Sequence, residues 1–190
     1  TASTSDTYWV KFVADNGTSG PGYWEETIDP SKSTGLDTAT MPHELVNNST
    51  NTFTFQKIAY TSRLVGDDVT NAHPSFIGQK IQQAFFYNNR LGFLSLDNVI
   101  LSQSGQHYNF YFTSAQTVTD ADPIDLQAST TKPAALHGVL PTTQGLILFS
   151  KNQQFLMSAQ ENIFTPTTVT IRTISNYEMD ASVDPVDMGS

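Results

Sequence analysis

FFYNNRLGFLSLDNVILSQSGQHYNFYFT, residues 85–113, is the stretch of sequence that decides the fold class. It is rich in aromatic residues, which favour strands. The pairs Asp97-Asn98 and Ser104-Gly105 are tight-turn signals that divide the stretch. The strands predicted here are 84–95, 99–104 and 108–113. A rigid antiparallel sheet of this kind, without a recognisable catalytic motif, indicates assembly or binding rather than chemistry.

Further short strands are predicted on both sides of this stretch. Alternating apolar and polar residues mark them, and turn signals such as Asp15-Asn16-Gly17 and Lys151-Asn152 separate them. These strands are 7–14, 23–28, 43–46, 52–59, 134–139, 146–150, 155–158 and 169–175. Strands at such intervals are typical of sandwiches, barrels and propellers. A helix of one or two turns is an even alternative for residues 76–84, where apolar residues recur at helical spacing.

The organisation of the chain follows from a change in composition. Residues 66–75 combine glycine, an Asp-Asp pair, asparagine and proline, which is typical of a linker. We expect a small antiparallel β module over 1–65 and blade-like sheets of a propeller-like domain over 66–190. The predicted fold is all-β, with short antiparallel strands in blade-like, propeller-type sheets and at most one short helix. Because the chain begins with Thr1 and ends at Ser190 without a terminating signal, we expect an internal fragment of a longer protein.

Composition excludes several classes of function. The formal net charge is −9, and the 9 basic residues are scattered singly among 18 acidic ones. Tight nucleic-acid binding needs clustered lysine and arginine to displace phosphate counterions, so it is not expected. The sequence has no cysteine, which excludes disulfides and cysteine-based zinc sites. No apolar run approaches the roughly 20 residues that a membrane-spanning helix needs.

Candidate metal ligands do not form a site in the sequence. The segment 43–46 begins like the His-Glu-x-x-His zinc motif, but Asn47 replaces the second histidine. Asp120, Asp122 and Asp125 place carboxylates close together, which suits calcium. The spacing of an EF-hand loop is absent, however, and Asp-Pro turns also form for structural reasons, which is the favoured interpretation. The histidines share no ligand spacing and are expected at turns or strand ends; they are His43, His73, His107 and His137.

No catalytic signature is found either. A Gly-x-Ser-x-Gly elbow and a phosphate-binding Gly-Lys-Ser/Thr loop are absent from the sequence. Glu25 and Glu26 are paired carboxylates of the kind used in glycoside hydrolysis, but adjacent residues of a regular strand point to opposite faces. A solvated strand edge is therefore the favoured role. We predict no catalytic, cofactor-binding or metal-binding residues and no enzyme activity.

The aromatic residues have two possible roles. Trp9, Trp24, Tyr108, Phe110 and Phe112 could form a platform on which sugars stack. The last three would share one face of the predicted strand 108–113, and an aromatic row of this kind is more often part of a core.

Several segments occur in the order expected for a known family. They are WVK (9–11), WEE (24–26), MPHEL (41–45), PSFIG (74–78), NRLGFLS (89–95), NVILSQSG (98–105), YNF (108–110), DPID (122–125), LILFS (146–150) and QFL (154–156). This collinear set resembles the tail tubular protein B family, the nozzle proteins of short-tailed, autographivirus-type phages. Each motif is weak alone, but together they extend over nearly the whole chain. Members of that family are several times longer than this chain, which agrees with an internal fragment.

The resemblance implies a function. Members of the family form a ring, understood as six-fold, below the portal and adaptor of the tail, and the ring encloses the channel through which DNA leaves the capsid. On this basis we expect a structural protein of the virion tail, assembled in the host bacterial cytoplasm. The expected partners are other copies of the chain and the tail adaptor and fibre proteins. DNA is expected to pass transiently without specific binding, and neither a membrane nor a cofactor is expected.

Two alternative functions remain open. A carbohydrate-binding module could recognise host surface polysaccharide through Trp9 and Trp24. A glycan-degrading enzyme could use acidic residues that folding brings together. The favoured interpretation of the net negative charge is that it keeps the protein soluble. The resemblance to the nozzle proteins offers a second role for it, since a negatively charged channel wall repels phosphates and lets DNA slide.

Overall fold

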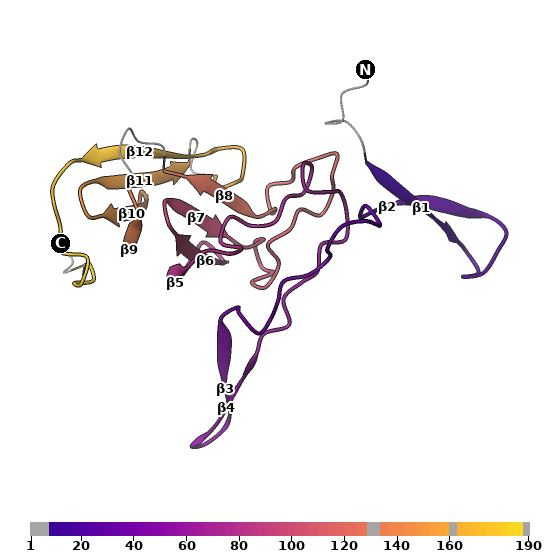
Figure 1. The fold of residues 1–190 in the computed structure, drawn as a ribbon, viewed down its shortest axis with the longest axis horizontal. Coiled ribbons are helices and arrows are strands. Elements are labelled where there is room, and N and C mark those ends of the chain that lie inside the picture. The colour runs from indigo at the N-terminus through magenta and orange to yellow at the C-terminus, as the bar shows by residue number, and fades with distance from the viewer. Residues whose placement is uncertain (1–7, 129–133, 160–162, 188–190) are drawn as a thin grey trace. The chain divides into compact units, whose positions relative to one another are not determined.

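The computed structural model describes residues 8–128, 134–159 and 163–187, and every regular element within them is a β-strand (Figure 1). The prediction of an all-β fold is confirmed. None of the described residues forms a helix long and apolar enough to cross a membrane. The chain forms two compact units. Unit 1 comprises Thr1–Ala72 and Tyr111–Thr117, and unit 2 comprises His73–Phe110 and Val118–Ser190.

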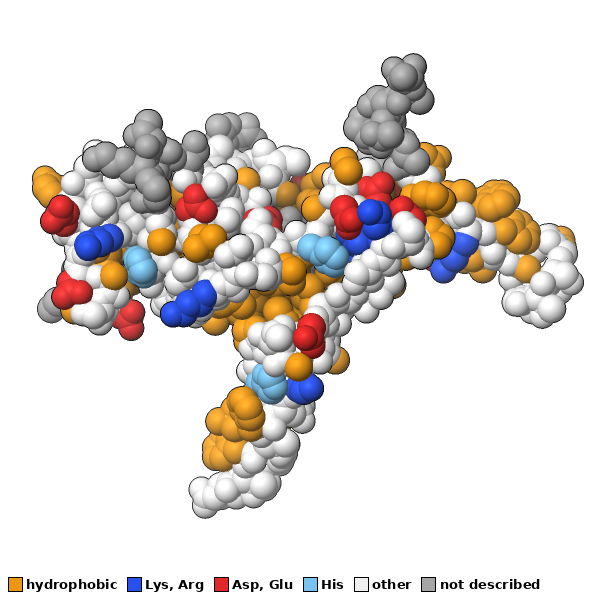
Figure 2. Space-filling view, in the orientation of Figure 1, with side chains coloured by type: hydrophobic (Ala, Val, Ile, Leu, Met, Phe, Trp, Pro, Cys, Tyr) orange, Lys and Arg blue, Asp and Glu red, His pale blue; other side chains and the backbone are white. Residues whose placement is uncertain are grey.

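Unit 1 contains two separate β-hairpins. β1 (Trp9–Ala14) pairs antiparallel with β2 (Gly22–Thr27), and β3 (His43–Ser49) pairs antiparallel with β4 (Thr52–Lys57). The second hairpin turns through Asn51, whose left-handed φ of 62° asparagine tolerates better than most residues. In the described chain each hairpin is a sheet of its own, two strands wide. Such a sheet buries neither of its faces by itself, and Figure 2 shows hydrophobic side chains exposed along both hairpins.

Unit 2 contains two four-stranded antiparallel sheets in which every strand pairs with its neighbour in sequence. The first sheet has the order β5-β6-β7-β8, and the second has the order β12-β11-β10-β9. The strands of the first sheet are Ile81–Tyr87, Arg90–Ser95, Asn98–Leu101 and Ile124–Gln127. Those of the second are Leu136–Thr142, Gly145–Ser150, Gln154–Ala159 and Val169–Ser175.

The core of unit 2 lies between these sheets. Both contribute fully buried aliphatic side chains, among them Leu94, Val99, Leu136 and Leu148. A second cluster consists of Phe76, Phe93 and Phe110, whose ring centroids are 5.3–5.5 Å apart. Phe93 and Phe110 stack, and Phe76 meets both rings edge-on. Such offset and edge-to-face geometries suit the quadrupoles of aromatic rings, so the cluster fixes the loops that carry Phe76 and Phe110.

The strand predicted over 84–95 is divided. It forms parts of β5 and β6, which meet at a turn of Asn88 and Asn89 with φ values of 48° and 58°. Positive φ at both central residues is the geometry of a type I′ hairpin turn, and asparagine favours it. The prediction overlooked this Asn-Asn signal.

The strand predicted over 108–113 is wrong. Phe110 and Tyr111 are neighbours and both are buried, which breaks the alternation of a strand face. The proposed row of Tyr108, Phe110 and Phe112 on one strand face therefore does not exist. β8, which the prediction missed, fills the edge position beside β7 instead.

The helix considered for 76–84 is also absent. Residues 75–78 form turns, with the N–H of Ile77 donating to the Pro74 carbonyl and that of Gln79 to the Phe76 carbonyl (both 3.0 Å). Gly78 then adopts a left-handed φ of 73°, which ends the turn, and β5 begins at Ile81.

Candidate functional site

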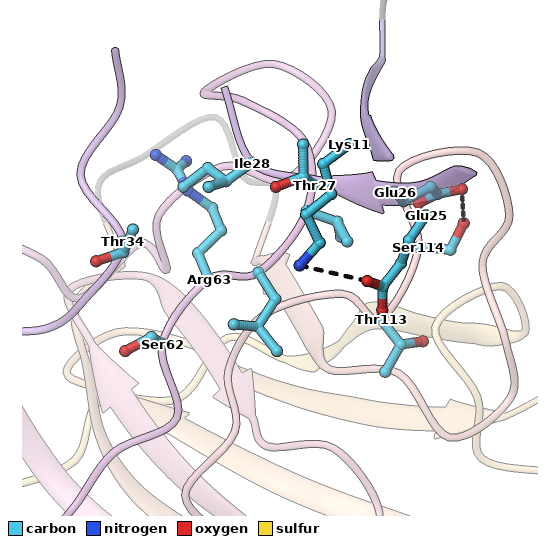
Figure 3. Close-up of a pocket in the computed structure, with 12 residues that line it drawn as sticks. Lys11, Glu25, Glu26, Thr27, Ile28, Thr34, Ser62, Arg63, Thr113 and Ser114 are labelled. Atoms are coloured by element: carbon cyan, nitrogen blue, oxygen red, sulfur yellow. Dashed lines mark hydrogen bonds and ion pairs between the residues drawn. The ribbon is translucent and has the colours of Figure 1, made fainter. Parts of the chain in front are cut away.

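Unit 1 contains a pocket of about 560 Å³ between β1–β2 and the loops that follow (Figure 3). Its lining is mixed in character, and the residues are Lys11, Glu25, Glu26, Thr27, Ile28, Thr34, Ser62, Arg63, Leu64, Val65, Thr113 and Ser114. No histidine is among them, so the lining contains no pairing of a nucleophile with an imidazole base.

Each glutamate of the pocket is bound by its own partner. The Glu25 carboxylate forms an ion pair with Lys11 Nζ (3.3 Å), its cross-strand neighbour on β1. The Glu26 carboxylate accepts hydrogen bonds from Ser114 Oγ (3.0 Å) and the backbone N–H of Ala115 (2.9 Å), so it anchors the returning segment 111–117. Both residues border the same pocket, which was not expected for neighbours on a strand, but their carboxylates have separate structural roles (Figure 3).

Arg63, one of the residues that line this pocket, is fully buried. Its Nη1 donates to the carbonyls of Asp67 (3.2 Å) and Asn71 (2.9 Å), and its Nη2 donates to the Ser33 carbonyl (2.8 Å). Nη1 also lies 2.9 Å from a carboxylate oxygen of Asp68. Through these Nη hydrogen bonds Arg63 holds three loop segments together, whereas its Nε is buried without a hydrogen-bond partner among the described residues.

Asp68 links this buried charge to the surface. Lys32 Nζ lies 2.9 Å from its second carboxylate oxygen. The hydrogen bond from Lys32 and then that from Arg63 lower the pKa of Asp68 below its ordinary value. The carboxylate therefore remains ionised in the folded state at all but acidic pH.

Tyr111, which lies near Arg63, provides a test of this buried cluster. Burial raises the pKa of the Tyr111 hydroxyl to about 12 from an ordinary value of 10, and the charge of Arg63 offsets this only in part. A raised folded pKa stabilises the fold below pH 10, and this contribution is lost as the pH rises toward 12. We expect unit 1 to lose about 2 kcal/mol over this range, and Tyr111→Phe to abolish most of that loss. Urea unfolding at pH 9 and pH 12 measures it, and equal losses in both proteins would contradict the assignment.

Unit 2 holds a second buried guanidinium. Nη1 of Arg90 donates to the carbonyls of Ser102 (2.8 Å), Ala121 (3.1 Å) and Asp122 (2.7 Å), and Nη2 donates to the Asp120 carbonyl (2.8 Å). Burial lowers the pKa of Arg90, while the nearby charge of Asp122 opposes this effect. Arg90 is the first residue of β6, and it thus holds the loops that carry Ser102 and residues 120–122 against the start of this strand.

The three aspartates considered for calcium serve different purposes. The Asp122 carboxylate accepts the backbone N–H of Thr119 (2.7 Å), and the Asp125 carboxylate accepts that of Ser75 (2.7 Å). Asp120 contributes its backbone carbonyl to Arg90. Among the described residues, no group of three or more acidic or histidine side chains could hold a metal ion. The hydrogen bond of Asp122 gives this segment a structural use.

The histidines and the aromatic residues do not converge on one site. His43 begins β3, donates a hydrogen bond from its ring nitrogen Nδ1 to the Met41 carbonyl (2.9 Å), and stacks on Phe55 with the ring centroids 5.1 Å apart. His107 lies against Phe86 instead. Trp24 is 68% exposed on β2 and meets the Phe12 ring edge-on, with the two planes 67° apart. Rings at this angle do not form the flat platform on which a sugar would stack.

Sequence reasoning missed the two arginines, which were regarded only as scattered basic residues. The available signal was weak. Arg90 follows directly on the Asn-Asn turn, but the composition around either arginine does not mark the backbone carbonyls that it meets.

Comparison with known proteins identifies the family. The whole chain, residues 1–190, matches the bacteriophage nozzle protein family. The tail tubular protein gp12 of Escherichia phage T7 is 32% identical to this chain over 188 residues, which cover 99% of the chain and 23% of that protein. The chain therefore spans about a quarter of the length of this curated relative. The predicted resemblance is confirmed, and the chain belongs to the bacteriophage nozzle protein family, a family of structural tail proteins.

Proposed function

We propose that the chain is one wedge of a ring of identical subunits, six in the full-length protein, that encloses the DNA-ejection channel of a phage tail. The match of the whole chain to the nozzle family is the observation that carries this proposal. The relative from phage T7, named a tail tubular protein, agrees with a tubular assembly. The tail adaptor and fibre proteins are the proposed neighbours of the ring.

The charge of the chain supports passage of DNA without binding. The net charge is −9, and the two arginines in the interiors of the units, Arg63 and Arg90, are buried and direct their Nη donors to carbonyl and carboxylate partners. A surface with few free cations does not recruit phosphates by counterion release. An acidic wall would repel the DNA backbone and let it slide at speed.

The two four-stranded sheets of unit 2 support a rigid scaffold role. Each has the meander order of a propeller blade, and we propose that they are two blades of a propeller-like domain completed by the rest of the subunit. In the same proposal, residues 1–65 form a β module separate from the blades of 66–190. No catalytic role is assigned, since the charged side chains that line the pocket in unit 1, those of Lys11, Glu25, Glu26 and Arg63, are engaged in structural bonds.

The carbohydrate-binding alternative is not favoured. The family match indicates a tail structural protein, and Trp24 and Phe12 meet edge to face rather than in one plane. The family match also fails to support the glycan-hydrolase alternative. Glu25 and Glu26 bind different partners, so their carboxylates do not act as a pair.

Electron microscopy of the full-length protein and of intact tails tests the proposal. We expect closed rings of the purified protein, and we expect this segment to lie in the wall around the tail channel. Full-length protein that remains monomeric at all concentrations, or density for this segment on the capsid or on a fibre, would refute the proposed function.

A further inference from the structure

The connection between β7 and β8 is long for two paired strands. β7 ends at Leu101 and β8 begins at Ile124, and these two residues are partners in the antiparallel pair. Such strands are ordinarily joined by about 2–5 residues, and loops longer than about 12–15 residues in a compact domain usually have a function. Both ends of the connection belong to unit 2, but its middle, residues 111–117, belongs to unit 1. We call residues 111–117 the strap.

Unit 2 holds the two ends of this connection together. Arg90 is buried, and its Nη1 donates to the carbonyls of Ser102 (2.8 Å) and Asp122 (2.7 Å), which lie on opposite sides of the strap in the sequence. The N–H of Ser104 also donates to the Ala121 carbonyl (2.8 Å). These hydrogen bonds form the neck of the strap. A loop with its ends held together has already lost part of the conformational entropy that docking of the strap would otherwise cost.

A buried amide of unit 1 holds the first part of the strap. Asn71 is 1% exposed, its Oδ1 accepts the N–H of Phe112 (2.9 Å), and its Nδ2 donates to the Phe112 carbonyl (3.1 Å). The side chain therefore pairs with both backbone groups of one residue, as two residues of an antiparallel ladder do. Nδ2 also donates to the Val65 carbonyl (3.0 Å). Because a buried amide is unfavourable without partners, Asn71 and the strap stabilise each other.

A carboxylate of β2 holds the second part of the strap (Figure 3). Glu26 accepts hydrogen bonds from Ser114 Oγ (3.0 Å), the N–H of Ala115 (2.9 Å) and Gln116 Nε2 (2.8 Å). All three donors lie on the strap, and hydrogen bonds to an ionised acceptor are stronger than those between neutral groups. Ala115 also lies close to Gly66, where an added Cβ would be 3.3 Å from the Cβ of Ala115. The strap is therefore held by both hydrogen bonds and packing.

The strap also supplies part of the small core of unit 1. Among the described residues, the buried hydrophobic side chains of this unit are Met41, Ile58, Tyr60, Val65 and, on the strap, Tyr111. The hairpins of the unit leave most of their own hydrophobic side chains exposed. A core this small gives little stability, so unit 1 needs the aromatic ring that the strap contributes.

We propose that the strap makes the folding of unit 1 conditional on the folding of unit 2. Unit 2 forms the neck with its own residues, and the closed neck holds the strap in the form that Asn71 and Glu26 bind. The dependence runs in one direction, because release of the strap leaves the neck and both sheets of unit 2 intact. Domains generally fold from the N-terminus during synthesis. Unit 1 is the exception, since it begins the chain but is completed by residues that follow β7. This coupling is independent of the proposed ring.

Hydrogen exchange in the full-length protein tests whether the strap stabilises unit 1. Glu26→Ala removes the carboxylate that anchors the strap, and we expect the backbone amides of residues 63–71 to exchange about ten-fold faster or more. The matched control is Glu25→Ala, which changes the neighbouring residue of β2 and frees only Lys11, so residues 63–71 should exchange at the wild-type rate. If Glu26→Ala changes exchange in the strap alone, the strap does not stabilise unit 1 and the inference is overturned.

Variants of the two buried arginines test the direction of the dependence. Arg90→Ala opens the neck, so residues 63–71 of unit 1 should exchange at least about ten-fold faster, together with β6 and β7. Arg63→Ala changes unit 1 alone and should leave β6 and β7 at the wild-type rate. If Arg90→Ala yields no folded protein, Arg90→Lys should show the same pattern with a smaller increase. Wild-type exchange of residues 63–71 beside rapid exchange of β6 and β7 would show that unit 1 folds by itself. Rapid exchange of β6 and β7 in Arg63→Ala would contradict the one-way dependence.

Discussion

Replacing Arg90 by alanine is expected to unfold unit 2 under conditions in which the wild-type unit is stable. The guanidinium of Arg90 donates to four backbone carbonyls, those of Ser102, Asp120, Ala121 and Asp122. In the alanine variant these carbonyls lose their donor, and each buried acceptor left unpaired costs about 1–3 kcal/mol. A cavity replaces the side chain as well. We expect a total loss on the order of 4–5 kcal/mol, which is a large fraction of the roughly 5–15 kcal/mol by which ordinary domains are stable.

Hydrogen exchange measured by mass spectrometry checks this result, because it reads β5–β8 separately from unit 1. Arg90→Lys should recover part of the loss, since an ammonium has three donors for four carbonyls and a different geometry. Arg172→Ala, which removes an exposed arginine from β12, is the matched control and should change stability by less than about 0.5 kcal/mol. If the backbone amides of β6 and β7 exchange at the wild-type rate in Arg90→Ala, the four hydrogen bonds from Arg90 to carbonyls do not stabilise unit 2.

Local patterns in the sequence were sufficient to predict most strands. Residues 169–175 were predicted with the bounds that β12 has, and 146–150 differ from β10 by one residue. Period-two alternation and turn residues act between near neighbours, so they are visible in a single sequence. The strand predicted over 108–113 failed because its aromatic residues are held by tertiary contacts, as in the stacking of Phe110 on Phe93.

The buried arginines of the two units, Arg63 and Arg90, could not be predicted in the same way. Arg90 binds carbonyls that lie up to 32 residues further along the chain, and Arg63 binds a carbonyl 30 residues before it. Backbone carbonyls belong to every residue type, so no composition or spacing marks the ones that an arginine will meet. The apolar face of the β3–β4 hairpin could have been predicted from the sequence, since its apolar and polar residues alternate. Only the structure shows that nothing in the described chain covers that face.

Replacing Arg63 by alanine is expected to destabilise unit 1 by about 3–5 kcal/mol, because it leaves three backbone carbonyls without a donor. The broken ion pair adds little, since the Asp68 side chain is 50% exposed and still pairs with Lys32. The affected groups are the carbonyls of Ser33, Asp67 and Asn71 and the carboxylate of Asp68. Unit 1 has few buried apolar residues to compensate, since its hairpins expose most of theirs. Exchange of the backbone amides of residues 63–71 measures the loss, and exchange in unit 2 serves as the internal reference.

The pH dependence of unit 1 separates the role of Arg63 from a simple loss of volume. The lowered pKa of Asp68 stabilises the folded state above the ordinary carboxyl pKa of 3.8, and this contribution disappears as the pH falls below that value. Arg63→Ala removes one cause of the lowered pKa, so the stability of unit 1 should depend less steeply on pH in the acidic range than in the wild type. Lys32→Ala should also reduce this dependence, yet it should destabilise unit 1 much less than Arg63→Ala does at pH 7, because Lys32 and Asp68 form a surface pair. If Arg63→Ala and Lys32→Ala lower the unfolding free energy of unit 1 equally at pH 7, the burial of Arg63 does not increase its contribution to stability. A wild-type acid dependence in Arg63→Ala would show that its guanidinium does not hold Asp68 in the ionised form.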